Sequence, residues 1–302
     1  MDKKQLRGSL LLTLTALIWG TAFVAQTVGM DHIGPFTFNA VRTLLAGVAM
    51  IPVILLFDKL QKKPPMSPQL RRDTLVGGVV CGTVLFVASS LQQAGIEAIT
   101  ENASGKAGFI TALYIIIVPL IGLLLGKRPR KLVWLCVVLA IVGFYLLCVT
   151  GDFSIGFGEL LVLGCAVGYS LHILVIDHFS PKADGMRMSC IQFFVSGILS
   201  AVAMFLLEEP TISGIWAANT AILYTGIMSS GVGYTLQIVA QKDVNPTLAT
   251  MIMSLESVFA VLAGWLLLHE TLSAKELLGC LLVFVAVILA QLPEKKKESV
   301  EA

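Results

Sequence analysis

Apolar residues along this chain are gathered into ten long runs, and short polar segments separate them. Each run is about 20 residues long, and a helix of that length, rising about 1.5 Å per residue, spans roughly 30 Å of hydrocarbon. A soluble helical protein would instead show one polar and one apolar face on most of its helices. The pattern therefore predicts membrane-spanning helices at residues 9–28, 36–57, 74–95, 107–126, 132–150, 157–176, 189–207, 215–239, 247–268 and 274–292.

The basic residues occupy alternate segments between these runs. If the N-terminus is cytoplasmic, 18 of the 21 Lys and Arg residues fall on the cytoplasmic side, and only Lys106 and Lys275 fall outside. The remaining one, Arg42, lies inside an apolar run. Basic residues beside membrane-spanning helices are retained in the cytoplasm, so this alternation indicates the orientation of the helices. We therefore expect an all-α integral membrane protein with ten transmembrane helices and with the N-terminus and C-terminus both cytoplasmic.

Composition agrees with this class and argues against several others. Charged residues make up 13% of the chain, about half of the roughly 25% that is typical of soluble domains. The basic residues lie at membrane edges rather than on one face, so we expect no nucleic-acid partner. The six cysteines all fall in apolar runs, without a Cys-x-x-Cys pair or a cluster of His. We therefore predict no metal site and no cofactor.

The two halves of the chain share a weak internal similarity. Shifted by 142 residues, seven residues of the fourth run fall on identical residues of the ninth, and five earlier residues repeat at a shift of 150. Five helices per half is an odd number, so a duplicated second half would lie upside down in the membrane. Such inverted repeats can open a midplane site to one side and then to the other. We predict two inverted five-helix repeats, 9–150 and 157–292, and a charged cytoplasmic tail, 293–302.

Two charged residues lie where the hydrocarbon should exclude them. Arg42 lies about two turns inside the second run, and Glu256 lies near the centre of the ninth. A charge at a helix centre costs about 2.5–3.5 kcal/mol on insertion scales, so such residues usually face a bundle interior or a wet cavity. Arg42 suits a substrate carboxylate, and Glu256 can bind a substrate ammonium or carry a proton. Alternatively Arg42 snorkels towards the outer surface or bonds to backbone carbonyls, Glu256 is a protonated structural residue bonded to a neighbouring helix, or the two residues pair directly.

Aromatic and amide side chains inside the runs are further candidates for a cavity wall. Trp19 lies in the middle of the first run, where the membrane interface does not explain it; packing against lipid is the alternative. For the Gln and Tyr candidates, the alternative is a hydrogen bond between helices. His172 is expected at the cytoplasmic interface, and Pro119 is expected to kink its helix. The candidate substrate-binding and translocation residues are Trp19, Arg42, Gln92, Gln93, Tyr114, Tyr169, Gln192, Tyr234, Gln237 and Glu256.

An ordered set of short motifs extends over nearly the whole chain. The first half contains Ala16-Leu-Ile-Trp-Gly-Thr-Ala-Phe-Val24, Arg42-x-x-x-Ala46, Ser104-Gly-Lys-Ala-Gly-Phe-Ile-Thr-Ala-Leu113 and Pro119. The second half contains Leu255-Glu-Ser-Val-Phe-Ala260, Gly264 and Leu266-Leu-Leu-His-Glu270. Through this set the chain resembles the ten-helix, EamA-type branch of the drug/metabolite transporter superfamily. The resemblance implies export of small metabolites, often amino acids or toxic analogues, from a bacterial inner membrane. It also implies a central cavity between two four-helix groups, with the fifth and tenth helices at the periphery.

Three positions depart from the pattern of that family. Ser257 stands where the family usually has a proline after Leu-Glu, which removes the residue expected to kink the helix after Glu256. Gly126-Lys127-Arg128 stands in place of a common Gly-Glu-Arg, and His269-Glu270 stands in place of Gly-Glu. These changes leave the class unchanged and put the geometry of the gates in question.

We expect a secondary transporter, not an enzyme, that exports a small metabolite by alternating access around a central cavity, with an amino acid or analogue as the leading candidate. No Gly-rich loop ending in Gly-Lys-Ser or Gly-Lys-Thr occurs, so ATP-driven transport by this chain alone has no support. The alternatives are a passive channel or facilitator and a carrier of another metabolite class, for example nucleotide-sugar-like molecules. An integral-membrane enzyme acting on lipid is a distant third.

The predicted partners are a small-molecule substrate, a coupled proton in one version of the mechanism, and the lipid bilayer of the cell inner membrane. Glycine pairs such as Gly78-x-x-x-Gly82 let helices approach closely. We interpret them as packing within the chain, with dimerisation as an alternative. The oligomeric state stays open, and a monomer agrees with the sequence. Substrate identity, coupling ion and direction of transport are also open.

Overall fold

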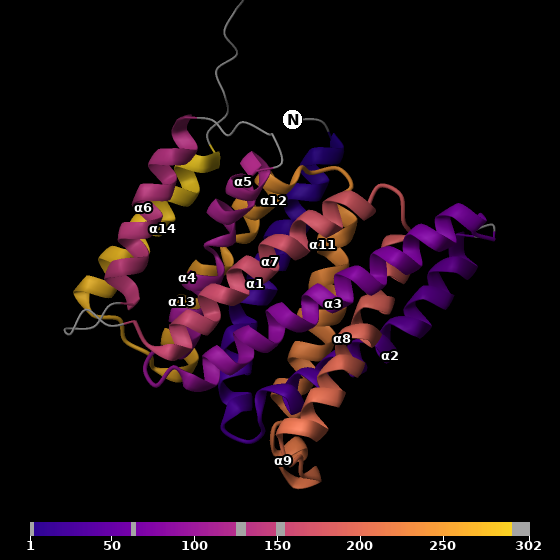
Figure 1. Cartoon of the computed structure of the whole chain (residues 1–302), viewed down its shortest axis with the longest axis horizontal. Coiled ribbons are helices and arrows are strands. Elements are labelled where there is room, and N and C mark those ends of the chain that lie inside the picture. The colour runs from indigo at the N-terminus through magenta and orange to yellow at the C-terminus, as the bar shows by residue number, and fades with distance from the viewer. Residues whose placement is uncertain (1–2, 62–64, 125–130, 149–154, 292–302) are drawn as a thin grey trace, which may run out of the picture.

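The computed structural model of the chain describes residues 3–61, 65–124, 131–148 and 155–291. Every regular element in these ranges is a helix, and the helices form one bundle (Figure 1). In chain order they are α1 (Lys3–Met30), α2 (Pro35–Gln61), α3 (Pro68–Ala98), α4 (Ala103–Thr111), α5 (Tyr114–Leu124), α6 (Lys131–Cys148), α7 (Phe157–Phe179), α8 (Gly185–Leu207), α9 (Ile212–Ala217), α10 (Asn219–Leu223), the π-helix η1 (Tyr224–Tyr234), α11 (Thr235–Ala240), α12 (Pro246–Met253), α13 (Glu256–Leu268) and α14 (Ala274–Gln291).

Much of this helical structure is long and apolar enough to cross a membrane, which fits an integral membrane fold. Seven such stretches lie within the described residues, namely Lys3–Met30, Pro35–Gln61, Pro68–Ala98, Ala103–Leu124, Phe157–Phe179, Gly185–Leu207 and Leu248–Leu268. The three other predicted runs are also helical, in α6, in α14 and from α9 through α11. The predicted tail 293–302 and the segment Gly126-Lys127-Arg128 lie outside the described residues.

Helix boundaries in the two halves of the chain correspond closely. α5 begins at Tyr114 and α13 begins at Glu256, 142 residues later, and each follows a two-residue interruption of its helix. α6 and α14 lie side by side at one edge of the bundle (Figure 1), the peripheral place that the family resemblance implies. The starts of α2 and α8 are 150 residues apart.

The two interruptions arise from a local tightening of the helix, and no proline lies at either point. At the first, Leu113 N donates to Ile110 O at 3.1 Å, and at the second, Leu255 N donates to Ile252 O at 3.2 Å, so the bonding changes to the i−3 pattern. In the second half the Ser254 hydroxyl also donates to the Met251 carbonyl at 2.7 Å, and such back-bonding bends helices.

The interruption in the second half lies before Glu256. Loss of the family proline at Ser257 removes the residue expected to kink the helix after Glu256, and α13 runs without interruption from Glu256 to Leu268. The Ser257 hydroxyl donates to the Ser254 carbonyl at 2.8 Å, so serine side chains bond backbone carbonyls where the family has proline. In the first half, the interruption at 112–113 precedes Pro119, which lies inside α5.

Glycines let α3 approach two helices of the second half at close range. A Cβ added at Gly82 would lie 2.7 Å from the Gln192 carbonyl oxygen, and one at Gly78 would lie 2.6 Å from Ile191 Cβ, both on α8. A Cβ at Gly168 of α7 would lie 2.9 Å from Ala88 Cβ on α3. The interpretation that Gly78-x-x-x-Gly82 packs helices within the chain is therefore confirmed.

We predict that Gly82→Ala lowers the stability of the folded protein by about 1–3 kcal/mol, because the added methyl group must displace a backbone carbonyl in a packed interface. The measurement is the thermal unfolding midpoint of the purified protein in detergent. Gly164→Ala is the matched control: Gly164 lies on α7 and faces α3, the helix that carries Gly82, and its Cβ would meet only Leu91 Cδ1 at an ordinary 3.5 Å. Equal midpoints for the two variants would contradict the packing argument.

Candidate functional site: a polar cavity between the two halves

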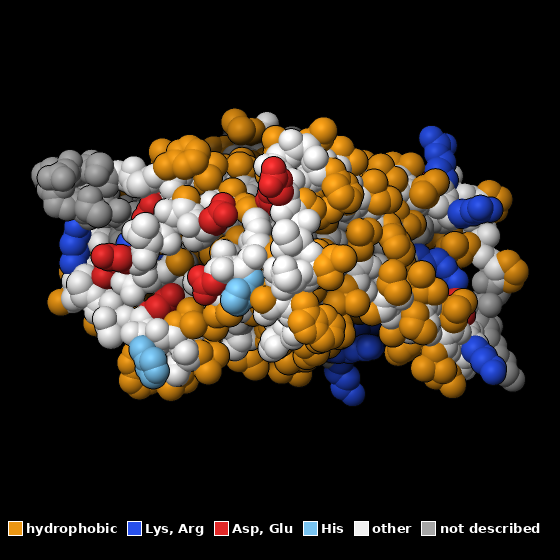
Figure 2. Space-filling view, turned by 90° about the horizontal axis from the view of Figure 1, so that it is seen from below, with side chains coloured by type: hydrophobic (Ala, Val, Ile, Leu, Met, Phe, Trp, Pro, Cys, Tyr) orange, Lys and Arg blue, Asp and Glu red, His pale blue; other side chains and the backbone are white. Residues whose placement is uncertain are grey.

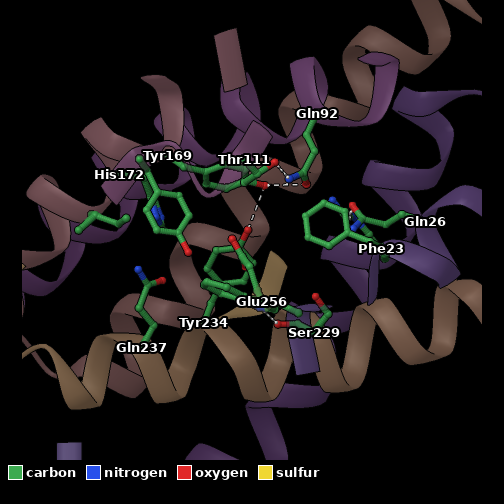
Figure 3. Close-up of a pocket in the computed structure, with 14 residues that line it drawn as sticks. Phe23, Gln26, Gln92, Thr111, Tyr169, His172, Ser229, Tyr234, Gln237 and Glu256 are labelled. Atoms are coloured by element: carbon green, nitrogen blue, oxygen red, sulfur yellow. Dashed lines mark hydrogen bonds between the residues drawn. The ribbon is translucent and has the colours of Figure 1, made fainter. Parts of the chain in front are cut away.

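A small cavity lies in the interior of the bundle, and both halves of the chain contribute to its wall (Figure 3). Its volume is about 30 Å³, room for about two water molecules. The residues that line it are Trp19, Phe23, Gln26, Arg42, Gln92, Thr111, Tyr114, Tyr169, His172, Ile173, Ser229, Tyr234, Gln237 and Glu256. Eight of the ten residues selected from the sequence are therefore brought together around one cavity.

The two helix interruptions place Tyr114 and Glu256 at this cavity, each as the first residue of the helix that follows. The Glu256 side chain is buried, with a relative exposure of 2%. The Tyr114 hydroxyl lies near the Glu256 carboxyl group and interacts with it, but neither Glu256 Oε1 nor the Tyr114 hydroxyl makes a hydrogen bond of good distance and angle with another described residue. A buried carboxylate without a partner is costly, so this group requires a proton or a cationic ligand.

Arg42 brings a positive charge to the same cavity and is held there by neutral groups. Its Nε donates to Asn39 Oδ1 at 3.0 Å, and its Nη1 donates to Gln26 Oε1 at 3.2 Å. The guanidinium carbon lies 5.4 Å from the centre of the Phe38 ring. In the described part of the chain no carboxylate lies within 4.0 Å of this guanidinium. Because Arg42 is only 5% exposed, it does not snorkel to the surface, and it does not pair directly with Glu256.

Aromatic rings and amides form a continuous hydrogen-bonded wall. The Tyr234 hydroxyl donates to the Tyr169 hydroxyl at 3.2 Å, Tyr169 donates to Gln92 Oε1 at 3.2 Å, and Gln92 Nε2 donates to Thr111 Oγ1 at 3.1 Å (Figure 3). The Trp19 and Tyr234 ring centres are 4.7 Å apart. This arrangement fixes the rings of one side of the cavity.

The π-helix η1 explains how Trp19 is anchored. Its indole Nε1 donates to the carbonyl oxygen of Ser229, in the middle of η1, at 3.0 Å. Turns of π-helix occur frequently at functional sites. Trp19 is therefore a part of the cavity wall, and the alternative of packing against lipid does not hold for its indole nitrogen.

Two candidates from the sequence do not line the cavity. Gln93 is fully buried and donates from Nε2 to the backbone oxygen of Gln26 at 3.2 Å. Gln192 is also buried, and its Oε1 lies 3.1 Å from His172 Nε2. Both amides support residues that do line the cavity, because their helices present them to the neighbouring helix.

His172 was not selected from the sequence, but it does line the cavity. It was expected at the cytoplasmic interface, but it is 1% exposed and lines the cavity, because α7 continues for seven residues beyond it to Phe179. Phe23, Gln26, Thr111, Ile173 and Ser229 were also missed. Helical spacing was an available signal for two of them, because Phe23 and Gln26 follow Trp19 by four and seven residues on one face of α1.

Acidic residues gather at one end of the bundle, the lower end in Figure 1 and the face seen in Figure 2. We call this the acidic end; it carries Asp31, Glu97, Glu101, Glu208 and Glu209. Two carboxylates of the second half cap helices of the first half there.

The Glu208 carboxylate accepts hydrogen bonds from the backbone N–H groups of Phe36 and Thr37 at 2.7 and 2.8 Å, and so caps α2. The Glu270 carboxylate accepts from the backbone N–H groups of Ser104 and Gly105 at 3.1 and 3.3 Å, and so caps α4. Free N–H groups and the helix dipole favour an anion at a helix start. Both contacts therefore hold the two halves together at the acidic end.

The opposite end of the bundle has a reciprocal contact. Asp58, near the end of α2, forms an ion pair with Arg187 in the first turn of α8, and Arg187 also contacts Asp184 at 3.1 Å. Asp58 and Glu208 are 150 residues apart, the shift that relates α2 to α8. In each case a carboxylate near the end of one of these helices binds at the start of the other.

Comparison with known proteins finds relatives of this chain and a structure with the same fold. An uncharacterized transporter of Archaeoglobus fulgidus is 31% identical over 291 residues, 96% of this chain and 87% of that protein. The uncharacterized inner membrane transporter YedA of Escherichia coli K12 is 26% identical and covers 91% of this chain and 88% of its own length. A crystal structure that is 19% identical covers 94% of this chain and 96% of its own with a TM-score of 0.70, and so has the same fold.

The sequence model of the EamA-like transporter family matches residues 6–149 and 156–292, nearly the whole chain. The apolar helices, the interior cavity with its buried charges and these relatives agree. This chain is a multi-pass membrane transporter, and it belongs to the EamA-like transporter family.

Proposed function

We propose that this chain is a secondary transporter that moves a small zwitterionic metabolite, with an amino acid or analogue as the first candidate, out of the cell by alternating access. One observation carries the proposal: two opposite charges without an ionic partner among the described residues, Arg42 and Glu256, line one buried cavity. A substrate carboxylate would bind Arg42 and a substrate ammonium would bind Glu256. Between transport events Glu256 would carry a proton, which removes the cost of an unpaired buried charge.

The size of the cavity supports a change of conformation during transport. Sites for small molecules usually occupy about 300–1,000 Å³, whereas this cavity has a volume of about 30 Å³. Substrate would therefore enter only after helices separate at one end of the bundle. A permanently open channel would not need this step.

The correspondence of helix boundaries supports two inverted repeats as the basis of that movement. We infer ten membrane crossings, because ten helical segments coincide with the ten apolar runs. The excess of Lys and Arg in alternate loops favours cytoplasmic termini, which makes the acidic end the outer one. The inner membrane is the inferred location, since the relative YedA is named as an inner membrane transporter.

On this proposal the caps made by Glu208 and Glu270 form the outer gate, and the Arg187–Asp58 pair forms part of the inner gate. Opening one end breaks contacts between the halves at that end while the contacts at the other end persist. Exchange between the two arrangements would expose the cavity to one side at a time.

We predict that Glu256→Gln and Arg42→Ala each reduce amino-acid counterflow in proteoliposomes to the level of protein-free vesicles. Vesicles are loaded with single amino acids and tested for uptake of the same labelled compound. Removing one partner of a buried charge pair costs about 2–5 kcal/mol, which is at least about 30-fold in binding.

Glu209→Gln is the control for both variants, because Glu209 is an exposed carboxylate at the acidic end and lies outside the cavity. Normal counterflow in the Glu256 and Arg42 variants would contradict the proposed site. Flux that neither saturates nor responds to internal substrate would favour a channel. Absence of counterflow with every amino acid, from folded protein, would direct the search to other metabolites.

We also predict that Glu208→Gln destabilises the described conformation by about 1–3 kcal/mol, because hydrogen bonds to a charged acceptor contribute roughly that amount. The amide also presents an N–H group toward the donors of Phe36 and Thr37. The measurement is the thermal unfolding midpoint, compared with that of Glu209→Gln. An unchanged midpoint for Glu208→Gln would show that this cap does not hold the acidic end.

A further inference from the structure

Unsatisfied hydrogen-bond acceptors are concentrated in the wall of the cavity. Among the described residues, four buried polar atoms of the cavity lining have no hydrogen-bond partner: three atoms that can only accept, Glu256 Oε1, His172 Nδ1 and Gln237 Oε1, and the Tyr114 hydroxyl, which can donate or accept. The three acceptors come from α13, α7 and α11, so three separate helices present them. Figure 3 shows His172 and Gln237 on one side of the cavity and Glu256 nearer its centre, beside Tyr234.

The protonation of His172 follows from its partner. His172 Nε2 lies 3.1 Å from Gln192 Oε1, which can only accept, so Nε2 carries the hydrogen atom. In the neutral ring the other nitrogen, Nδ1, is then an acceptor with a free lone pair. Gln192, one of the residues selected from the sequence, thus acts on the cavity by positioning His172.

An unsatisfied buried acceptor is expensive, and three in one small cavity indicate a ligand rich in donors. Water supplies two donors, and a primary ammonium group supplies three donors together with a positive charge. The negative charge of Glu256 selects the cation. The rings of Trp19 and Tyr234, whose centres are 4.7 Å apart, border the same space, and aromatic faces also attract a cation.

We propose that Glu256, His172 and Gln237 form a binding subsite for a primary ammonium group, with each side chain accepting one N–H donor. The inference rests on the proposed function and narrows its substrate class to primary amines. A trimethylammonium group has the same charge and no N–H donor, so it leaves all three acceptors unsatisfied. Sites built to bind a donor reject analogues that lack it far more strongly than they reject a change of size.

The test compares butylammonium chloride with butyltrimethylammonium chloride as ligands of the purified full chain in detergent at constant ionic strength. Binding is measured from the concentration dependence of the unfolding midpoint and from Trp fluorescence, to which Trp19 contributes. We expect butylammonium to bind at least about tenfold more tightly than butyltrimethylammonium. Because the assay measures binding rather than flux, it gives its result whether or not amino acids prove to be transported.

Two variants test whether the subsite causes the preference for butylammonium, and a third variant is their control. Gln237→Leu and His172→Phe should each reduce the ratio of the two affinities to nearly one. Gln241→Leu is the matched control, because Gln241 is a buried amide one turn beyond Gln237, lies outside the cavity and donates to the Ile173 carbonyl. It should keep the full ratio. Either cavity variant is sufficient if the other does not yield monodisperse protein.

Several results would overturn the subsite. Equal affinities for the two ammonium ions in the unsubstituted protein would show that the site does not recognise N–H donors. A stabilisation by sodium chloride as large as that by butylammonium chloride would indicate a metal cation site instead. An unchanged affinity ratio in both Gln237→Leu and His172→Phe would place the preference elsewhere in the cavity.

Discussion

The burial of Glu256 is the constraint on which the rest of the structure depends. The residue is 2% exposed, and Oε1 of its carboxyl group lacks a hydrogen-bond partner in the described part of the chain. Hydrocarbon would exclude such a group, and an interior cavity with polar walls admits it. The serine-stabilised interruption between α12 and α13 places Glu256 at the start of a helix and directs it into that cavity. The Arg42 charge, held by Asn39 and Gln26, completes an environment suited to a ligand with both charges.

Polar contacts between the two halves of the chain lie at both ends of the bundle, on either side of the cavity. Glu208 and Glu270 of the second half cap helices of the first half, and Asp58 of the first half pairs with Arg187 of the second. All of these contacts are polar, between elements far apart in the chain, and can form and break without unfolding a helix. Close glycine packing, as at Gly82, brings α3 directly against α8.

The helical segments and the two buried charges could be predicted from the sequence, because hydrophobic runs and isolated charges in hydrocarbon depend on local sequence alone. The internal repeat also gives Tyr114 the position in the first half that Glu256 has in the second, and both residues begin helices at the cavity. The two interruptions could not be predicted, because no proline lies at either point and both depend on backbone bonding, to which serine side chains add only in the second half. The partners of Glu208 and Glu270 are more than 160 residues away, and the depth of His172 depends on where α7 ends.

The central claim is that the cavity around Glu256 opens to each side of the membrane in turn. The most direct measurement uses Ser229→Cys, in a background without the six native cysteines, and a membrane-impermeant thiol reagent applied to either face of oriented vesicles. Ser229 lines the cavity and is 5% exposed, so modification reports opening. Alternating access predicts modification from both faces, slowed from both by the substrate. Modification from one face alone, or from neither, would contradict it, and modification from both faces that the substrate does not slow would indicate an open pore.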